Sequence, residues 1–112
     1  MDGRLAAGLE VTSLLRRAET LGGFGMVLHK GDDQRGAILI AVLERGRHAA
    51  FLERTLRLNG GYGWSVVGPT SNESQKSAIF IAQRRRADPD QWVIELDIPD
   101  AERFIAETSD EG

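Results

Sequence analysis

Residues 84–97 decide how this chain is organised, and they read Arg84-Arg85-Arg86-Ala87-Asp88-Pro89-Asp90-Gln91-Trp92-Val93-Ile94-Glu95-Leu96-Asp97. The arginines suit the end of a helix, where the negative pole of the helix dipole favours cations. Asp88 precedes Pro89 and so disfavours helical geometry. The stretch therefore predicts a helix that ends near Arg86, a turn, and a strand.

The flanking residues extend both elements. Thr70 opens a capping-box pattern that predicts the helix start, and the helix should turn one apolar face inward, formed by Ala78, Ile79, Ile81 and Ala82. In the strand, large apolar side chains alternate with Val93, Glu95 and Asp97, and they are Trp92, Ile94, Leu96 and Ile98. A short last helix begins after Pro99.

The composition describes one soluble domain spanning residues 1–112. The chain has no cysteine, which excludes disulfides, thiolate nucleophiles and cysteine-bound zinc. With two histidines and no phosphate-binding loop, we expect no metal and no cofactor. No apolar run approaches the roughly 20 residues that span a bilayer, and the N-terminus lacks a signal-peptide pattern. We expect a cytoplasmic protein without a membrane partner.

Charge is distributed unevenly along the chain. Residues 1–87 carry 13 Lys and Arg against 8 Asp and Glu, whereas residues 88–112 carry 1 against 9, which gives +5 and −8 and the net charge of −3. Such a division indicates either a basic face for an anionic partner together with an acidic tail, or two halves that neutralise one another on the folded surface.

The N-terminal half predicts one helix and several strands. Leu5 and Leu9 lie opposite the apolar face of the following residues, so we expect an extended segment over 5–11 and a helix over 12–21. Strands over 24–29, 37–43 and 48–55 are separated by short polar turns, which predicts an antiparallel meander. A further strand over 64–67 lies between glycine-rich turns.

Together these segments predict an α+β fold. We expect an antiparallel sheet of about five strands, two main helices packed on one face, and a short C-terminal helix. Residues 107–112 should form a frayed acidic tail.

The strongest candidate binding residues are arginines at helix ends. Arg84 and Arg85 could contact an anion, helped by Arg16 and Arg17 if the helices are neighbours and by an exposed Trp64 for stacking. The same arginines also stabilise a helix end without any ligand. We therefore expect a non-catalytic binding or adaptor domain, with an anionic ligand or acidic protein surface as partner. Nucleic acid is less favoured because the chain is acidic overall.

Two alternatives remain open. His29 ends a strand close to Asp32 and Asp33, an arrangement from which a small enzyme could build a general base. No nucleophile can be identified near His29, so we assign no catalytic residue. The second alternative is a self-associating protein that pairs through a sheet edge, and the strand over residues 64–67 is the edge that we suspect first.

Several of these stretches resemble a known bacterial family. The Gly31-Asp32 turn, Gly36-Ala37-Ile38 and the run from Arg84 to Glu95 make the chain similar to domain of unknown function 1491, over about residues 9–104. In that family the position before Asp88 is often aromatic, whereas here it is Ala87. The resemblance implies a small intracellular bacterial protein, and it implies no reaction, cofactor or partner.

Overall fold

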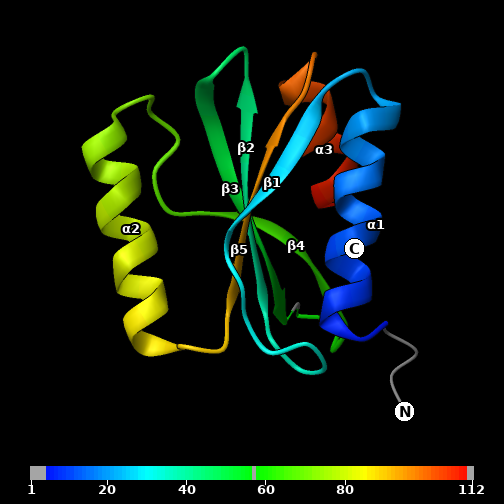
Figure 1. Cartoon of the computed structure of the whole chain (residues 1–112), viewed down its shortest axis with the longest axis vertical. Helices are drawn as coiled ribbons and strands as arrows, with labels where there is room; N and C mark the ends of the chain where they lie inside the picture. The colour runs from blue at the N-terminus through cyan, green and yellow to red at the C-terminus, as the bar shows by residue number, and fades with distance from the viewer. Residues whose placement is uncertain (1–4, 57, 111–112) are drawn as a thin grey trace.

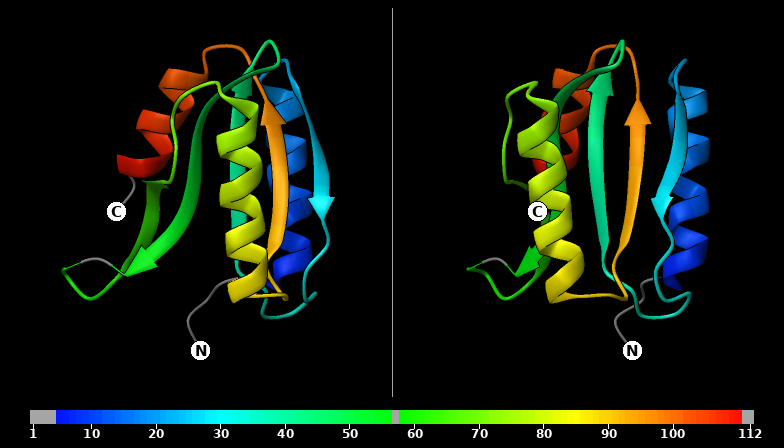
Figure 2. Two further views of the ribbon diagram at one scale, coloured as in Figure 1. Left: turned by 90° about the vertical axis from the view of Figure 1, so that its left-hand side faces the viewer. Right: turned by 60° about the vertical axis from the view of Figure 1, so that its left-hand side comes forward.

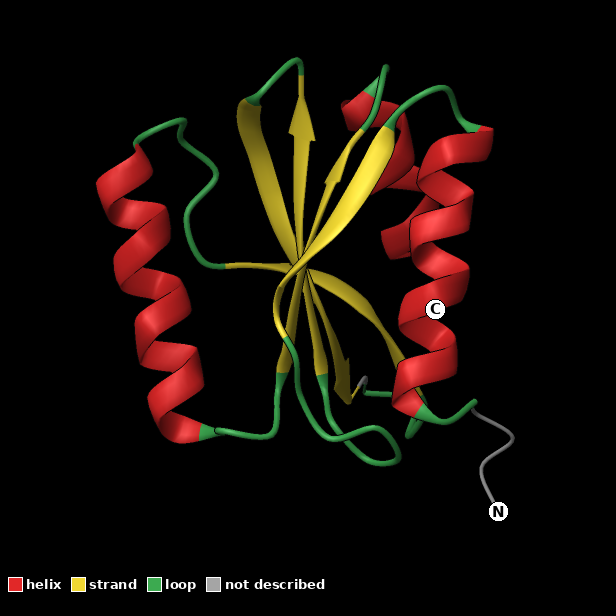
Figure 3. Ribbon diagram, in the orientation of Figure 1, coloured by secondary structure: helices red, strands yellow, loops and turns green. Residues whose placement is uncertain are grey.

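The computed structural model describes residues 5–56 and 58–110. This part of the chain forms three helices and five strands, whose arrangement can be followed in Figures 1 and 3. They are α1 (Ala7–Thr20), β1 (Phe24–His29), β2 (Ile38–Glu44), β3 (Arg47–Leu56), β4 (Tyr62–Val67), α2 (Ser74–Ala87), β5 (Trp92–Asp97) and α3 (Ala101–Asp110). The predicted α+β class is confirmed. None of the described helices has the length and apolar character needed to cross a membrane.

The sheet is mixed, which corrects the expectation of a purely antiparallel one. Its strand order is β1-β5-β2-β3-β4. The pairs β1–β5, β2–β3 and β3–β4 are antiparallel, whereas β2 and β5 run parallel, with Ile40 opposite Ile94. The predicted hairpin of the second and third strands is confirmed, but the predicted pairing of the first with the second is wrong.

The reason lies in the last strand. β5 is buried on both faces and lies between β1 and β2, so it separates two strands that are close in sequence. A strand whose two faces are both apolar is stabilised most at the centre of a sheet, where both faces are covered. The loop between β1 and β2 passes the start of β5 rather than closing a hairpin.

Helices cover both faces of the sheet, which differs from the expectation of two main helices on one face. Figure 1 shows α1 and α3 on one side and α2 on the other. One core combines α1 and α3 residues such as Val11 and Phe104 with Ile40, Leu52 and Ile94. The second combines Phe80 and Ile81 of α2 with inward-facing neighbours on the opposite strand face, Leu39, Ala41, Phe51 and Val93.

α1 begins at Ala7, so the extended segment predicted over residues 5–11 is wrong. Leu5 and Leu9 remain exposed instead of forming a second buried face. The helix start is stabilised from outside the helix: the N–H groups of Ala7 and Gly8 donate to the carbonyls of Gln34 and Asp33. These bonds satisfy backbone donors that a helix start otherwise leaves without partners.

α2 is attached to the sheet by few side chains. None of its residues is fully buried, and Ala78, Ile79 and Ala82, expected to face inward, are exposed. The inward contacts come chiefly from Phe80, whose ring lies 4.8 Å from that of Phe51.

The C-terminal helix extends further than expected. α3 continues to Asp110, and Thr108 is buried, so residues 107–110 are helical rather than frayed. Residues 111–112, the rest of the predicted tail, lie outside the described residues. Ala101 and Phe104 are buried and Ile105 is half-buried, as the apolar pattern of this helix predicts.

Candidate functional site

The loop of residues 31–36 is fastened to the start of β5. The backbone N–H of Asp32 donates to the carbonyl of Asp90 at 2.9 Å, and the indole Nε1 of Trp92 donates to the carbonyl of Asp32 at 2.7 Å. A Cβ at Gly31 would lie 2.2 Å from the Asp90 carbonyl oxygen, so only glycine allows this approach. Two of the stretches that carry the family resemblance, the Gly31-Asp32 turn and the run from Arg84 to Glu95, thus contact one another, which gives them a structural role.

The carboxylate of Asp32 shapes the same loop. It accepts the backbone N–H groups of Gln34 and Arg35 at 2.9 and 2.8 Å. Hydrogen bonds from these two backbone groups, that of Arg35 first, hold the pKa of Asp32 below its ordinary value. Since the same loop caps α1, it places Arg35 beside the start of that helix.

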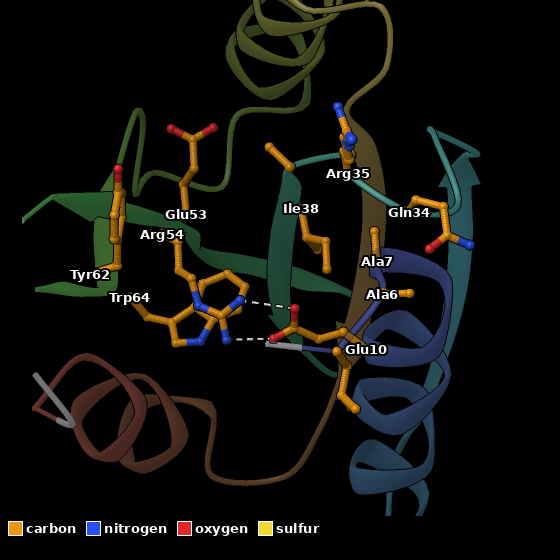
Figure 4. Close-up of a pocket in the computed structure, with 13 residues that line it drawn as sticks. Ala6, Ala7, Glu10, Gln34, Arg35, Ile38, Glu53, Arg54, Tyr62 and Trp64 are labelled. Atoms are coloured by element: carbon orange, nitrogen blue, oxygen red, sulfur yellow. Dashed lines mark hydrogen bonds and ion pairs between the residues drawn. The ribbon is translucent and has the colours of Figure 1, made fainter. Parts of the chain in front are cut away.

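A pocket of about 630 Å³ opens at this point, between the start of α1, the loop and the strands β2 to β4. Figure 4 shows its residues. Its polar side chains are Glu10, Gln34, Arg35, Glu53 and Arg54, and its aromatic side chains are Tyr62 and Trp64. A second hollow, whose lining includes Gly22, Asp97 and Asp100, has a volume of about 370 Å³.

An ion pair forms one wall of this pocket. Arg54 donates from Nη1 to Oε1 of Glu10 at 2.9 Å and from Nη2 to Oε2 at 2.5 Å, in a two-pronged arrangement. The guanidinium carbon lies 4.8 Å from the ring centre of Trp64. Both charged side chains are largely buried, so the pair connects α1 to β3 in a region of reduced solvent access.

The neighbouring residue Glu53 points to the other face of the sheet. Its carboxylate accepts from Nε2 of Gln91 at 2.7 Å and pairs with Nη2 of Arg84 at 3.3 Å. This contact links the pocket rim to α2.

The arginines predicted as a binding patch do not share a face. Arg16 and Arg17 belong to α1 and Arg84 and Arg85 to α2, and the sheet lies between these helices (Figure 1). The structure brings Trp64 together with Arg54.

Most of these arginines have partners inside the fold. Arg17 lies 4.9 Å from the ring centre of Phe104. Nη1 of Arg85 donates to the carbonyls of Pro89 and Gln91, both at 2.9 Å, and so fastens the end of α2 to the following turn. Arg84 pairs with Glu53 and lies 5.0 Å from the ring centre of Phe80. Arg16 is exposed.

Trp64 differs from its expected role as an exposed aromatic, because only 9% of it is exposed. Sequence reasoning also missed Glu10, Arg35 and Arg54. A signal for Arg54 was present: in the strand predicted over residues 48–55, a period of two places Arg54 on the same face as the apolar residues Ala50 and Leu52. A charge at such a position needs a partner.

The catalytic alternative gains no support from the geometry. Among the described residues no hydrogen bond joins His29 to Asp32, and Oδ1 of Asp32 accepts two backbone N–H groups instead. His29 is exposed and does not line the pocket. No group of three or more His, Cys, Asp or Glu suited to a metal ion occurs in the part of the chain that the structure describes.

Several solved structures are similar to this chain. A crystal structure of a DUF1491 family protein from Caulobacter crescentus CB15 is 30% identical, with a TM-score of 0.78 over 90% of this chain and 94% of that one. An NMR structure of a DUF1491 family protein from the same organism is 30% identical, with a TM-score of 0.74 over 87% and 88%. A solution structure from A. tumefaciens, 24% identical with a TM-score of 0.72 over 87% and 88%, shares the fold.

No curated protein matches the chain. The family model described as protein of unknown function (DUF1491) matches residues 5–106, which is nearly the whole length. The chain therefore belongs to the DUF1491 family.

Proposed function

We propose that this protein is a non-catalytic binding domain that holds a small anionic ligand in the pocket between α1, β3, β4 and the 31–36 loop. The observation that supports this best is the pocket itself, in which Arg54 lies against Trp64 and Arg35 stands at the rim. Small-molecule sites are concave and combine apolar walls with a few positioned polar groups.

The arginines favour an anion as the ligand. A guanidinium has five N–H donors, and Glu10 takes two of those on Arg54. The other donors of Arg54, and Arg35 from the opposite rim, would contact one carboxylate or phosphate between them. Glu10 would orient Arg54 for this contact, and the aromatic surface of Tyr62 and Trp64 would pack against the body of the ligand.

Binding is favoured over catalysis by the residues of the pocket. Among the described residues that line the pocket, none is His, Ser, Thr, Cys or Lys, the side chains that supply most nucleophiles and many bases. Its two carboxylates are both engaged, Glu10 by Arg54 and Glu53 by Arg84 and Gln91. Neither carboxylate is therefore placed to act as a general base toward a substrate.

The pocket is also favoured over the helix-end arginines as the binding site. Arg84 pairs with Glu53, and Arg85 donates to the carbonyls of Pro89 and Gln91. These contacts stabilise the end of the helix without any ligand. If these two arginines turned to a ligand, α2 would lose their contacts with the rest of the fold. α2 is already the helix with the fewest side chains packed inward.

A thermal-shift and NMR titration with phosphate, dicarboxylates, aromatic carboxylates and nucleotides tests the proposal. A ligand at about 100 times its dissociation constant should stabilise the fold by roughly 2.7 kcal/mol. The variant Arg35→Gln should lose most of that stabilisation, relative to its own unliganded melting temperature. The matched control Arg16→Gln, an exposed arginine on α1, should retain it.

Two results would contradict the proposal. One is binding that persists in Arg35→Gln but disappears in Arg85→Gln, which would place the ligand at the helix-end arginines. The other is a complete lack of shifts for the pocket residues with every anion at millimolar concentration.

A further inference from the structure

The edge strand β1 lacks the features that protect most sheet edges. Among the strands that the structure describes it pairs only with β5, so within this part of the chain its other side presents backbone N–H and C=O groups without strand partners. Its residues, Phe-Gly-Met-Val-Leu-His, include no lysine, no acidic residue and no proline. Natural edge strands usually carry such residues because they discourage pairing with another chain.

Apolar side chains are exposed along the same strand. Phe24 is 58% exposed, Met26 49% and Val27 38%. On the face that carries Phe24 and Met26, α2 lies in front of β2 and β3, and β1 and β5 lie beside it without a covering helix (left view of Figure 2). Phe24 and Met26 share this face and form an exposed apolar patch that a partner would cover, whereas Val27 points to the other face of the sheet.

We propose that β1 is a self-association surface, through which two copies of this chain pair antiparallel around a two-fold axis near Met26. The contact would join the two sheets into one of ten strands. Met26 would face Met26 of the second copy, and Phe24 would face its Leu28, because residues on the same face pair across such an axis.

Charge complementarity favours a second copy as the occupant. Antiparallel pairing brings the Lys30 end of one β1 to the Gly22–Gly23 end of the other. That end borders a concavity of about 370 Å³ in which three acidic residues, Glu44, Asp97 and Asp100, outnumber one arginine, Arg45. Lys30 is exposed, and so is Asp100. The two-fold axis would repeat this attraction at both ends of the contact.

The small size of the contact indicates a weak association between the two copies. A six-residue edge falls at the small end of specific interfaces, below about 1,200 Å² of total buried surface. We therefore expect a reversible dimer with a dissociation constant in the range of about 1 to 100 μM. This inference is independent of the pocket, which lies at the start of α1.

Sedimentation velocity over a range of roughly 1 μM to 1 mM tests the proposal. The wild type should shift from monomer to dimer. Met26→Lys should remain monomeric throughout, because it places two cations opposite each other at the axis. The matched control is Val66→Lys on β4, the other edge strand, where Val66 is 45% exposed and the dimer should persist.

Circular dichroism and the melting temperature show that each variant is folded, so loss of the dimer cannot be confused with unfolding. Lys30→Glu should weaken dimerisation at least tenfold at low salt. Asp100→Asn should weaken it less, and asparagine tolerates the positive φ of 55° at this position. A monomeric wild type at 1 mM, or a dimer lost in Val66→Lys and kept in Met26→Lys, would overturn the proposal.

Discussion

Glu53 and Arg54 are neighbours in β3, and each forms an ion pair with a helix on a different face of the sheet. Glu53 pairs with Arg84 of α2, and Arg54 pairs with Glu10 of α1. Successive strand residues point to opposite faces, so two adjacent charges can fasten two helix layers. The same two residues line the pocket. The stability of the fold and the ligand binding that we propose therefore depend on the same two residues.

Replacement of Arg54 by alanine should destabilise the protein by about 1–3 kcal/mol, because it leaves the largely buried carboxylate of Glu10 without its partner. Arg54→Lys should lose less, since it keeps the charge and loses the two-pronged geometry. Urea unfolding measures both. In Glu10→Gln/Arg54→Ala the losses should be less than additive. A loss below about 0.5 kcal/mol for Arg54→Ala would show that the pair contributes little.

Trp92→Phe should cost about 1 kcal/mol through loss of the hydrogen bond from Nε1 to the carbonyl of Asp32. The ring contacts in the core would largely remain, although the smaller ring adds a cavity cost. Chemical unfolding followed through Trp64, the other tryptophan of the chain, measures the effect. Amide chemical shifts should change mainly at residues 31–36. Shifts confined to the sheet core, with the loop unchanged, would contradict the proposed fastening.

α2 should be the least stable of the three helices. Hydrogen exchange is expected to be faster in α2 than in β5, because none of the residues of α2 is fully buried. Phe80→Ala should accelerate that exchange further and destabilise the fold by about 1–3 kcal/mol, less than for a fully buried phenylalanine. Ile79→Ala is the matched control: Ile79 is half exposed, and the change should stay within about 0.5 kcal/mol. Equal protection of α2 and β5 would refute this ranking.

The stabilising effect of Asp32 should disappear in acid. Its pKa is lowered in the folded state by the backbone hydrogen bonds of Arg35 and Gln34, so ionised Asp32 favours folding. This contribution is present above the ordinary pKa of 3.8 and is lost as the pH falls through the lower folded value. Wild type should therefore be more stable than Asp32→Ala at pH 7, and the difference should shrink below pH 4. Parallel denaturation curves at each pH measure it, and a constant difference would exclude this origin.

Local sequence patterns determined several elements of this protein. The stretch 84–97 predicted the end of α2, the turn and β5, because proline geometry and alternating side chains act within a few residues. The hairpin of β2 and β3 and the apolar face of α3 followed from similar short-range rules. The charged residue at an inward position of β3, Arg54, was also visible as a pattern, although its partner was not.

Only the tertiary structure decided which strands pair and which charges meet. The pattern of apolar residues along a strand predicts whether one or both of its faces are buried. It does not predict which strands and helices cover those faces. Thus β5, far along the chain, separates β1 from β2 and makes the sheet mixed. The start of α1 depends on carbonyls of Asp33 and Gln34. The pocket is formed by Glu10, Arg54 and Trp64, residues that only long-range packing brings together.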